Sequence, residues 1–142
     1  MTLIPAAGVA AFSRDGRLLL GRHAHDSRWA TLGGGVEEGE SADEAARREV
    51  LEEVGLRLNK LAFLGSFGDK PIYDVQYPDD SVVSYRVDIF GAIADDTNPR
   101  PDGNEIVEAG WFALEDLVSI DLAPDMTEIV PAAFEWFDQQ QL

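Results

Sequence analysis
The first quarter of the chain alternates short hydrophobic runs with polar turns. Residues 3–12 and 17–23 are two such runs, and the four residues between them, Ser-Arg-Asp-Gly, end in the Asp-Gly pair that favours a hairpin. Residues 29–32 form a shorter run and predict a further strand. Residues 33–35 are three glycines, which indicates a backbone that needs conformational freedom or approaches another group closely.

Helical spacing of small apolar residues begins after the glycines. Ser41 followed by Glu44 is the signature of a capping box, so we expect a helix over residues 42–54. Gly55 suits the position that ends this helix. One face of it should pack against a sheet, because it carries Ala42, Ala46, Val50 and Val54.

The second half of the chain continues the alternation. The expected elements are a strand over residues 56–67, a hairpin turn around residues 77–81 whose second arm is residues 82–93, a polar loop over residues 95–104, a strand over residues 107–113 and a helical turn over residues 114–117. Strands interspersed with two or three helices predict an α/β fold, with a mixed β-sheet covered by helices.

An amphipathic helix over residues 127–140 closes the chain. The residues expected to face inward are Ile129, Ala133, Phe134 and Phe137. Pro131 suits only the first turn of this helix, because proline lacks the N–H that later turns use.

Composition narrows the class of protein. The chain has 142 residues, 45% of them hydrophobic, which fits a single domain over residues 1–142. It has no cysteine, which excludes disulfides, thiolate metal sites and a cysteine nucleophile. No apolar run is long enough to span a bilayer, and the apolar N-terminus lacks the basic flank of a signal peptide. We therefore expect a soluble, cytoplasmic protein that does not act at a membrane.

The net charge of −16, from 27 acidic and 11 basic residues, bears on the partner. Nucleic-acid polymers are bound through basic patches, so we do not expect one as a partner. A small anionic substrate is compatible with this charge, because a metal ion and a few arginines can reverse the potential locally. The sequence leaves the oligomeric state open, with a homodimer as one possibility.

Three acidic residues stand together on the first predicted helix: Glu49, Glu52 and Glu53. At about 100° per residue they project from one narrow stripe. Like charges at these spacings destabilise a helix, and a divalent cation would remove the conflict because carboxylate oxygens are ligands that Mg²⁺ prefers. The alternative is an acidic surface helix, in which Arg48 and Glu52 form an ordinary ion pair.

Residues 34–56 resemble the Nudix box, G-x5-E-x7-R-E-U-x-E-E-x-G-U, where U is a bulky aliphatic residue. The matching residues are Gly34, Glu40, Arg48, Glu49, Val50, Glu52, Glu53, Gly55 and Leu56. The resemblance implies an α/β/α sandwich in which the box forms a loop–helix–loop. It also implies metal-dependent hydrolysis of a nucleoside diphosphate linked to a moiety X, or of a nucleoside triphosphate. Water would attack phosphorus and a nucleoside monophosphate would be released, with Mg²⁺ as cofactor and Mn²⁺ as a substitute.

The resemblance assigns roles within the box. Glu49, Glu52 and Glu53 would bind the metal, with Gly34 beside them. Arg48 would orient a box glutamate through a charge-assisted hydrogen bond, and Glu40 would be its structural partner.

The resemblance also implies a binding role for the glycines before the helix. Gly34 and Gly35 would lie in a loop whose amides and carbonyl face metal or phosphate. Gly33 stands where the family usually has proline, which would loosen this loop.

Outside the box, Glu105 corresponds to a further metal-binding or base glutamate of some family members, with Glu108 as its rival. The general base would be Glu52, Glu53 or Glu105. Arg22 resembles a phosphate-contacting arginine. The residues that accompany it near the box are His23, His25, Arg28 and Trp29.

Three alternatives to a hydrolase differ in what they require of the sequence. A non-catalytic domain that senses a nucleotide would be expected to lose box glutamates, and none is lost here. An isoprenoid diphosphate isomerase would require a cysteine near the site. A purely structural acidic protein would not require an intact box.

Overall fold
A mixed β-sheet forms the centre of the protein. The computed structural model describes residues 3–140 and 142, so the first two residues of the apolar N-terminus lie outside the described part. The strand order is β3-β2-β1-β7-β5, made by Trp29–Ala30, Leu18–His23, Ile4–Phe12, Val82–Ile93 and Ala62–Gly68. Three further strands, β4 (Leu32–Gly35), β6 (Asp74–Gln76) and β8 (Ile106–Phe112), pair with β1, β7 and β2. The β1–β7 pair is parallel and the other pairs are antiparallel.

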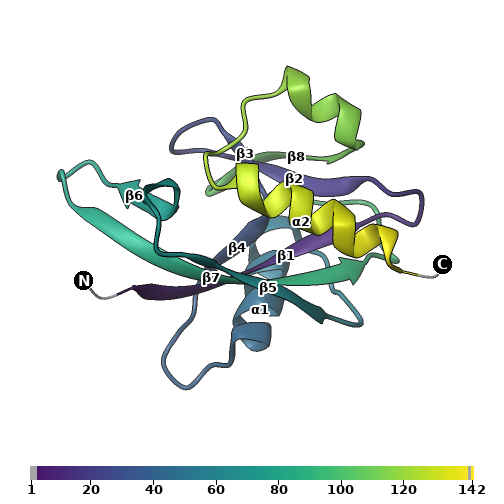
Figure 1. The fold of residues 1–142 in the computed structure, drawn as a ribbon, viewed down its shortest axis with the longest axis horizontal. Helices are drawn as coiled ribbons and strands as arrows, with labels where there is room; N and C mark the ends of the chain where they lie inside the picture. Colours follow the sequence, from purple (N-terminus) through teal and green to yellow (C-terminus); the bar gives the residue numbers. More distant parts are fainter. Residues whose placement is uncertain (1–2, 141) are drawn as a thin grey trace.

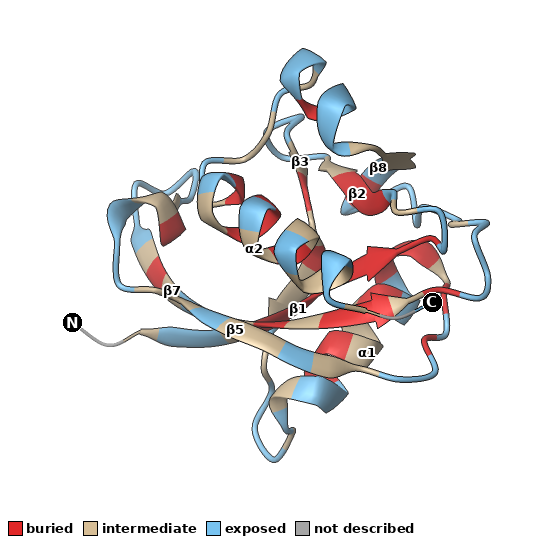
Figure 2. Ribbon diagram, turned by 45° about the vertical axis from the view of Figure 1, so that its right-hand side comes forward, coloured by how far each residue is buried: buried red, intermediate tan, exposed pale blue. Residues whose placement is uncertain are grey.

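Helices cover both faces of this sheet. Helix α1 (Ala42–Val54) lies on one face and helix α2 (Met126–Asp138) on the other (Figures 1 and 2). Two 3₁₀ helices, η1 (Pro71–Tyr73) and η2 (Leu114–Ser119), lie in the connections. The predicted α/β class with a mixed sheet is therefore confirmed. Within the described part of the chain, no helix is both long and apolar enough to cross a membrane.

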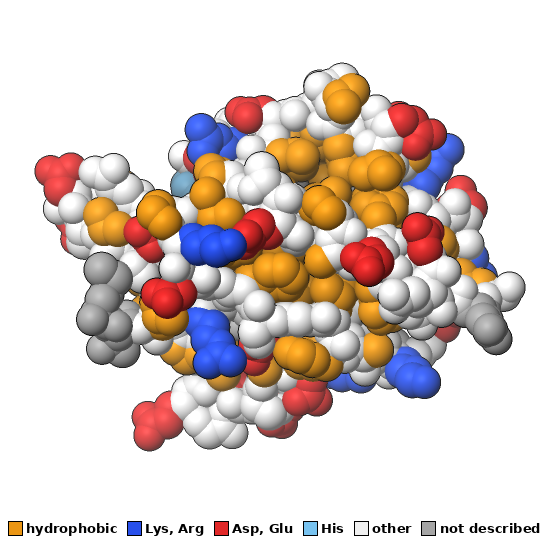
Figure 3. Space-filling view, in the orientation of Figure 1, with side chains coloured by type: hydrophobic (Ala, Val, Ile, Leu, Met, Phe, Trp, Pro, Cys, Tyr) orange, Lys and Arg blue, Asp and Glu red, His pale blue; other side chains and the backbone are white. Residues whose placement is uncertain are grey.

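Charged side chains are spread over the surface. On the face shown in Figure 3, the Lys and Arg side chains lie apart from one another, and Asp and Glu side chains lie among them. This face therefore carries no continuous basic patch of the kind that binds a nucleic-acid backbone.

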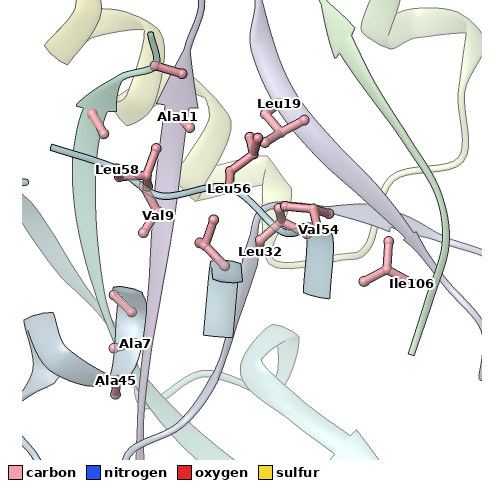
Figure 4. Close-up of a cluster of buried hydrophobic side chains, with 14 residues drawn as sticks. Ala7, Val9, Ala11, Leu19, Leu32, Ala45, Val54, Leu56, Leu58 and Ile106 are labelled. Carbon is pink, nitrogen blue, oxygen red and sulfur yellow. The ribbon is translucent and has the colours of Figure 1, made fainter. Parts of the chain in front are cut away.

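Each helix covers its own hydrophobic core. The core under α1 includes Val50, Val54 and Leu56, which pack on side chains of β1, β2 and β4 (Figure 4). In the core under α2, the fully buried ring of Phe12 stacks on Phe137 with ring centroids 4.8 Å apart. The inward faces predicted for the two helices are confirmed, since their residues are buried or packed against these cores.

The predicted ends of α1 are also confirmed. The Ser41 Oγ accepts a hydrogen bond from the Glu44 amide at 3.4 Å, and the Glu44 carboxylate accepts one from the Ser41 amide at 3.0 Å. Gly55 ends the helix with a left-handed φ of 69°, a conformation that glycine adopts without steric cost.

Four sequence predictions are wrong in detail. The run over residues 29–32 divides into β3 and β4, and residues 56–61 cross from α1 to the sheet edge without strand pairing. The glycine triplet lies in β4 rather than in a loop. Pro131 lies in the second turn of α2, which begins five residues earlier at Met126. In each case the packing of neighbouring elements overrides the local preference of the sequence.

Candidate active site
Three carboxylates from two distant segments meet at one point. Glu49 and Glu53 project from α1, and Glu105 comes from the loop before β8. One oxygen of each lies within 4.8 Å of the others. Glu53 is only 2% exposed, Glu49 is half-buried and Glu105 is exposed. Carboxylates at this separation repel one another, so the arrangement favours a bound cation.

Arg48 connects the carboxylate cluster to the turn before α1. Its Nε and Nη2 donate to the two oxygens of Glu40 at 2.7 and 3.0 Å, a bidentate pair. Its Nη1 donates to Glu49 at 3.0 Å and to Glu52 at 3.3 Å, and its Nη2 also donates to the Gly35 carbonyl at 3.0 Å. The pKa of Glu40 is lowered, mainly by the hydrogen bond from Arg48. The orienting role of Arg48 stays a prediction, and the bond to Glu49 is the contact through which Arg48 would exert it.

Glu53 is the most deeply buried of the three carboxylates. The pKa of Glu53 is raised to about 8, mainly by burial and also by repulsion from Glu49, while a hydrogen bond from the Gly33 amide opposes the shift. That amide lies 3.0 Å from the Glu53 Oε1. Proline has no amide hydrogen, so glycine at position 33 supplies a contact that the usual family residue cannot make. Gly33 is held in β4 opposite Gly8 rather than in a loosened loop.

Gly34 lies directly against Glu49. A Cβ added to Gly34 would lie 2.5 Å from the Glu49 carboxylate, whereas a Cβ on Gly35 would meet nothing within 4 Å. The glycine therefore leaves space that the Glu49 carboxylate occupies. Close approach, the second of the two explanations for the glycine triplet, is the one that applies.

The donor set fits a hard divalent cation. Carboxylate oxygens are the ligands that Mg²⁺ and Mn²⁺ take, and a cation with few protein ligands keeps positions for water and phosphate. The side chains that would hold it are Glu49, Glu53 and Glu105. Glu52, predicted as a ligand, is not in this group; it is 58% exposed and pairs with Arg48.

A cavity of about 510 Å³ opens along strand β4, and its described lining includes none of the three carboxylates themselves. Gly33 and Gly34 belong to its lining, so one wall of the cavity is the strand that contacts Glu53 and Glu49. Apolar side chains of β7 and α2, among them Val87 and Ile129, form much of the rest. The volume falls within the range of about 300–1,000 Å³ typical of small-molecule sites.

Several polar groups also line the cavity: His23, His25, Asp26, Arg28, Asp74, Gln76 and Asp125. Arg22 is not in the lining, and its Nε donates to Glu108 at 3.0 Å on the neighbouring strand. Glu108 is thereby accounted for as the partner of Arg22. Burial lowers the pKa of His23, and repulsion from His25 lowers it further.

Asp125 is a lining residue that the sequence did not reveal. It precedes α2, where an aspartate suggests an ordinary helix cap, yet its side chain makes no capping hydrogen bond. Burial raises the pKa of Asp125 to about 6. Only the packing of α2 against the sheet brings this carboxyl into the cavity.

Gly34→Ala is expected to weaken Mn²⁺ binding about tenfold, a loss typical of changes beside a metal ligand. The new methyl group would displace the Glu49 carboxylate, which lies 2.5 Å from its position. Electron paramagnetic resonance of free Mn²⁺ measures this affinity. Gly35→Ala adds the same methyl group to open space and should keep the wild-type affinity. Equal affinities for all three proteins would contradict the close contact.

Known proteins and a family model are similar to this chain. The NUDIX domain family model matches residues 2–137. The chain is similar to the oxidized purine nucleoside triphosphate hydrolase of Mus musculus, with 34% identity over 77% of this chain and 66% of that protein. It is 27% identical to the NAD-capped RNA hydrolase NudC of Vibrio cholerae over 77% of this chain and 37% of that protein. The chain thus spans less than two thirds of the length of these curated relatives.

Solved structures have the same fold. The MutT NUDIX hydrolase of Burkholderia pseudomallei superposes with a TM-score of 0.70 and 25% identity, covering 95% of this chain and 98% of that one. The NUDIX domain of Shewanella oneidensis NrtR, solved with ADP ribose, gives a TM-score of 0.79 at 15% identity, covering 96% of this chain and 90% of that one.

Proposed function
Because this chain belongs to the NUDIX family, we propose that it is a hydrolase of nucleoside diphosphate derivatives or triphosphates. Water attacks phosphorus and a nucleoside monophosphate is released, with Mg²⁺ as cofactor and Mn²⁺ as a substitute. One observation carries the proposal: Glu49, Glu53 and Glu105 converge within 4.8 Å beside a cavity whose wall includes Gly33 and Gly34. Residues 1–142 act as a single domain in this proposal.

The side chains divide into holding and proton-accepting groups. Glu49, Glu53 and Glu105 hold the cation, which when bound would polarise the phosphoryl oxygens and neutralise charge on the leaving group. Arg48 keeps Glu49 in place through the bond at 3.0 Å. Glu52 lies outside the ligand group and is exposed, so it accepts the proton of the attacking water without giving up a metal ligand.

The cavity takes the nucleoside. Its apolar wall on β7 and α2 suits a flat base, and the Gly33–Gly34 wall directs the phosphates toward the carboxylates. Arg28 is the arginine among the described lining residues, and its pair with Asp121 is long, at 3.9 Å. In this proposal it contacts phosphate in place of Arg22, which lies outside the lining and pairs with Glu108 at 3.0 Å. An arginine suits this task because its charge is permanent.

Charge favours free nucleotides over the 5′ ends of RNA as substrates. A bound RNA chain needs Lys or Arg for the phosphates that follow the first nucleotide. Besides Arg28, the cavity lining carries three acidic side chains, those of Asp26, Asp74 and Asp125. They would repel a second and third phosphate, so the relatives that act on RNA are the less suitable guide to substrate.

A substrate panel in ¹⁸O-labelled water tests the proposal. It should contain ordinary and oxidised nucleoside triphosphates, ADP-ribose, nucleoside diphosphate sugars and a 5′-triphosphorylated oligoribonucleotide. We expect metal-dependent release of a nucleoside monophosphate from at least one free nucleotide, with label in one phosphate-bearing product. Label is expected there because water attacks phosphorus and the chain has no cysteine to form a covalent intermediate.

Two results would contradict the proposal. Tight nucleotide binding without turnover, at any Mg²⁺ or Mn²⁺ concentration, would indicate a nucleotide-sensing domain. Preferential cleavage of the oligoribonucleotide would overturn the substrate assignment and leave the hydrolase intact.

A further inference from the structure
The loop that carries Glu105 is fastened to the end of α1. The Arg100 amide donates to the Val54 carbonyl at 2.7 Å, and the Asp102 amide donates to the Glu53 carbonyl at 2.9 Å. The Arg100 Nη2 donates to the Gly55 carbonyl at 2.7 Å. The Glu53 and Val54 carbonyls are among those that a helix leaves without an intrahelical partner at its C-terminus, and the Gly55 carbonyl follows directly after them. The loop is therefore docked on the same helix that carries Glu49 and Glu53.

A single side-chain oxygen of Asp102 binds the backbone of the last residues of this loop. The Asp102 Oδ1 accepts hydrogen bonds from three backbone amides, those of Asn104 at 3.1 Å, Glu105 at 3.2 Å and Ile106 at 2.9 Å. Gly103 allows the turn between them with a φ of 78°. Asp102 is itself exposed, so its contribution comes from these bonds rather than from packing.

Glu105 needs such support because its neighbours repel it. Its carboxylate approaches Glu49 and Glu53 to within 4.8 Å, and without a cation charged carboxylates at this distance favour separation. Glu105 is exposed, so a freely moving loop could carry it away into water. A loop fixed by its backbone keeps the third carboxylate at the site before any cation arrives.

We propose that Asp102 is a positioning residue that holds Glu105 in the metal site by fixing the amides of residues 104–106. The inference rests on the metal set of the proposed function, with Glu105 as its third ligand. Asp102 touches neither cation nor substrate in this role. It acts through the loop, as supporting residues around a metal site commonly do.

Mn²⁺ affinity without substrate provides the test, measured by electron paramagnetic resonance. Asp102→Ala should weaken Mn²⁺ binding about tenfold or more, similar to Glu105→Gln, because supporting residues typically contribute about 10–100-fold to affinity. Asp102→Asn keeps an acceptor oxygen and should stay within about threefold of wild type. The double variant Asp102→Ala, Glu105→Gln should bind Mn²⁺ no more weakly than the weaker of the two single variants, because both substitutions act on the same ligand, the Glu105 carboxylate.

Asp96→Ala is the matched control. Asp96 also accepts a backbone bond in the same loop, from Asn98 at 2.9 Å, and pairs with Arg100 at 3.2 Å, but it bonds no amide of residues 104–106. It should keep the wild-type Mn²⁺ affinity. In the metal-free protein, amide hydrogen exchange at residues 104–106 should accelerate about tenfold or more in Asp102→Ala and remain slow in Asp96→Ala.

The proposal is overturned if Asp102→Ala binds Mn²⁺ like wild type, or if Asp102→Asn binds it as weakly as Asp102→Ala. It is also overturned if the fold loss of Mn²⁺ affinity in the double variant equals the product of the losses in the two single variants. It is also overturned if Glu105→Gln leaves the affinity unchanged. Since none of these measurements uses turnover, absence of hydrolysis across the substrate panel would reject the proposed function alone. Circular dichroism of each variant confirms that the compared proteins are folded.

Discussion

Glu53→Gln should lower kcat about a thousandfold, because a bound cation contributes several kcal/mol to phosphoryl transfer and each ~1.4 kcal/mol changes the rate tenfold. Glu53 is fully buried at the convergence of the carboxylates, and the amide keeps its shape but is a much poorer cation ligand. Mn²⁺ affinity should fall together with turnover. Both are measured on the same preparation.

The same substitution should not harm the fold. The amide oxygen can still accept the hydrogen bond that the Gly33 amide makes to Glu53 at 3.0 Å. Above about pH 8, where the Glu53 carboxyl of the metal-free wild type is charged, the substitution also ends its repulsion from Glu49 and Glu105. The thermal midpoint of the metal-free variant should therefore equal or exceed that of the wild type, which circular dichroism can follow.

Two variants sharpen the test. Glu52→Gln should lower kcat but keep Mn²⁺ affinity, since Glu52 lies outside the ligand group. Glu38→Gln changes an exposed residue of the turn before α1 and should keep both properties. A Glu53→Gln protein with near-normal turnover at saturating Mg²⁺ would remove Glu53 from the metal set.

Removal of divalent cations should abolish activity and leave the protein folded. Three carboxylates form an open site that water and phosphate complete, not a closed cage that supports the fold. The two hydrophobic cores lie on either side of the sheet and do not depend on the site. Treatment with EDTA should therefore reduce turnover to background while the circular dichroism spectrum stays unchanged.

Restoring the cation provides the control for this experiment. Excess Mg²⁺ should return full activity and raise the unfolding free energy by about 2.7 kcal/mol at a hundred times its Kd, because it binds the folded state alone. Zn²⁺-free buffers exclude a contaminating metal as the source of recovery. Loss of the folded spectrum on chelation would indicate a structural metal instead.

The sequence revealed the helix and most of its chemistry because these features are local. A helix fixes the relative direction of residues a few positions apart, so the spacing of Glu49 and Glu53 already indicated a shared face. Ser41 and Gly55 marked the ends of that helix through caps that use only neighbouring backbone groups. The arm over residues 82–93 matched β7 for the same reason, since a turn signal precedes a run in which apolar and polar residues alternate.

Contacts between distant segments could not be derived in this way. The sequence placed Glu52 in the metal set and left Glu105 uncertain. The position of Glu105 depends on its loop, which docks on the end of α1, about fifty residues earlier in the chain. Arg22 and Arg28 are both basic residues near the box, and only the pairing of β2 with β8 separates them: Arg22 faces Glu108, while Arg28 lines the cavity.

The sequence by itself therefore determined the family resemblance, the α/β class, the capped helix and the carboxylates on its face. Tertiary structure decided which carboxylates meet, that the glycine triplet is a strand pressed against Glu49 and Glu53, and that Asp125 lines a cavity. The physical reason is the range of the interactions. Helix periodicity and capping act over a few residues, whereas strand pairing, burial and the convergence of charges depend on segments that only the folded chain brings together.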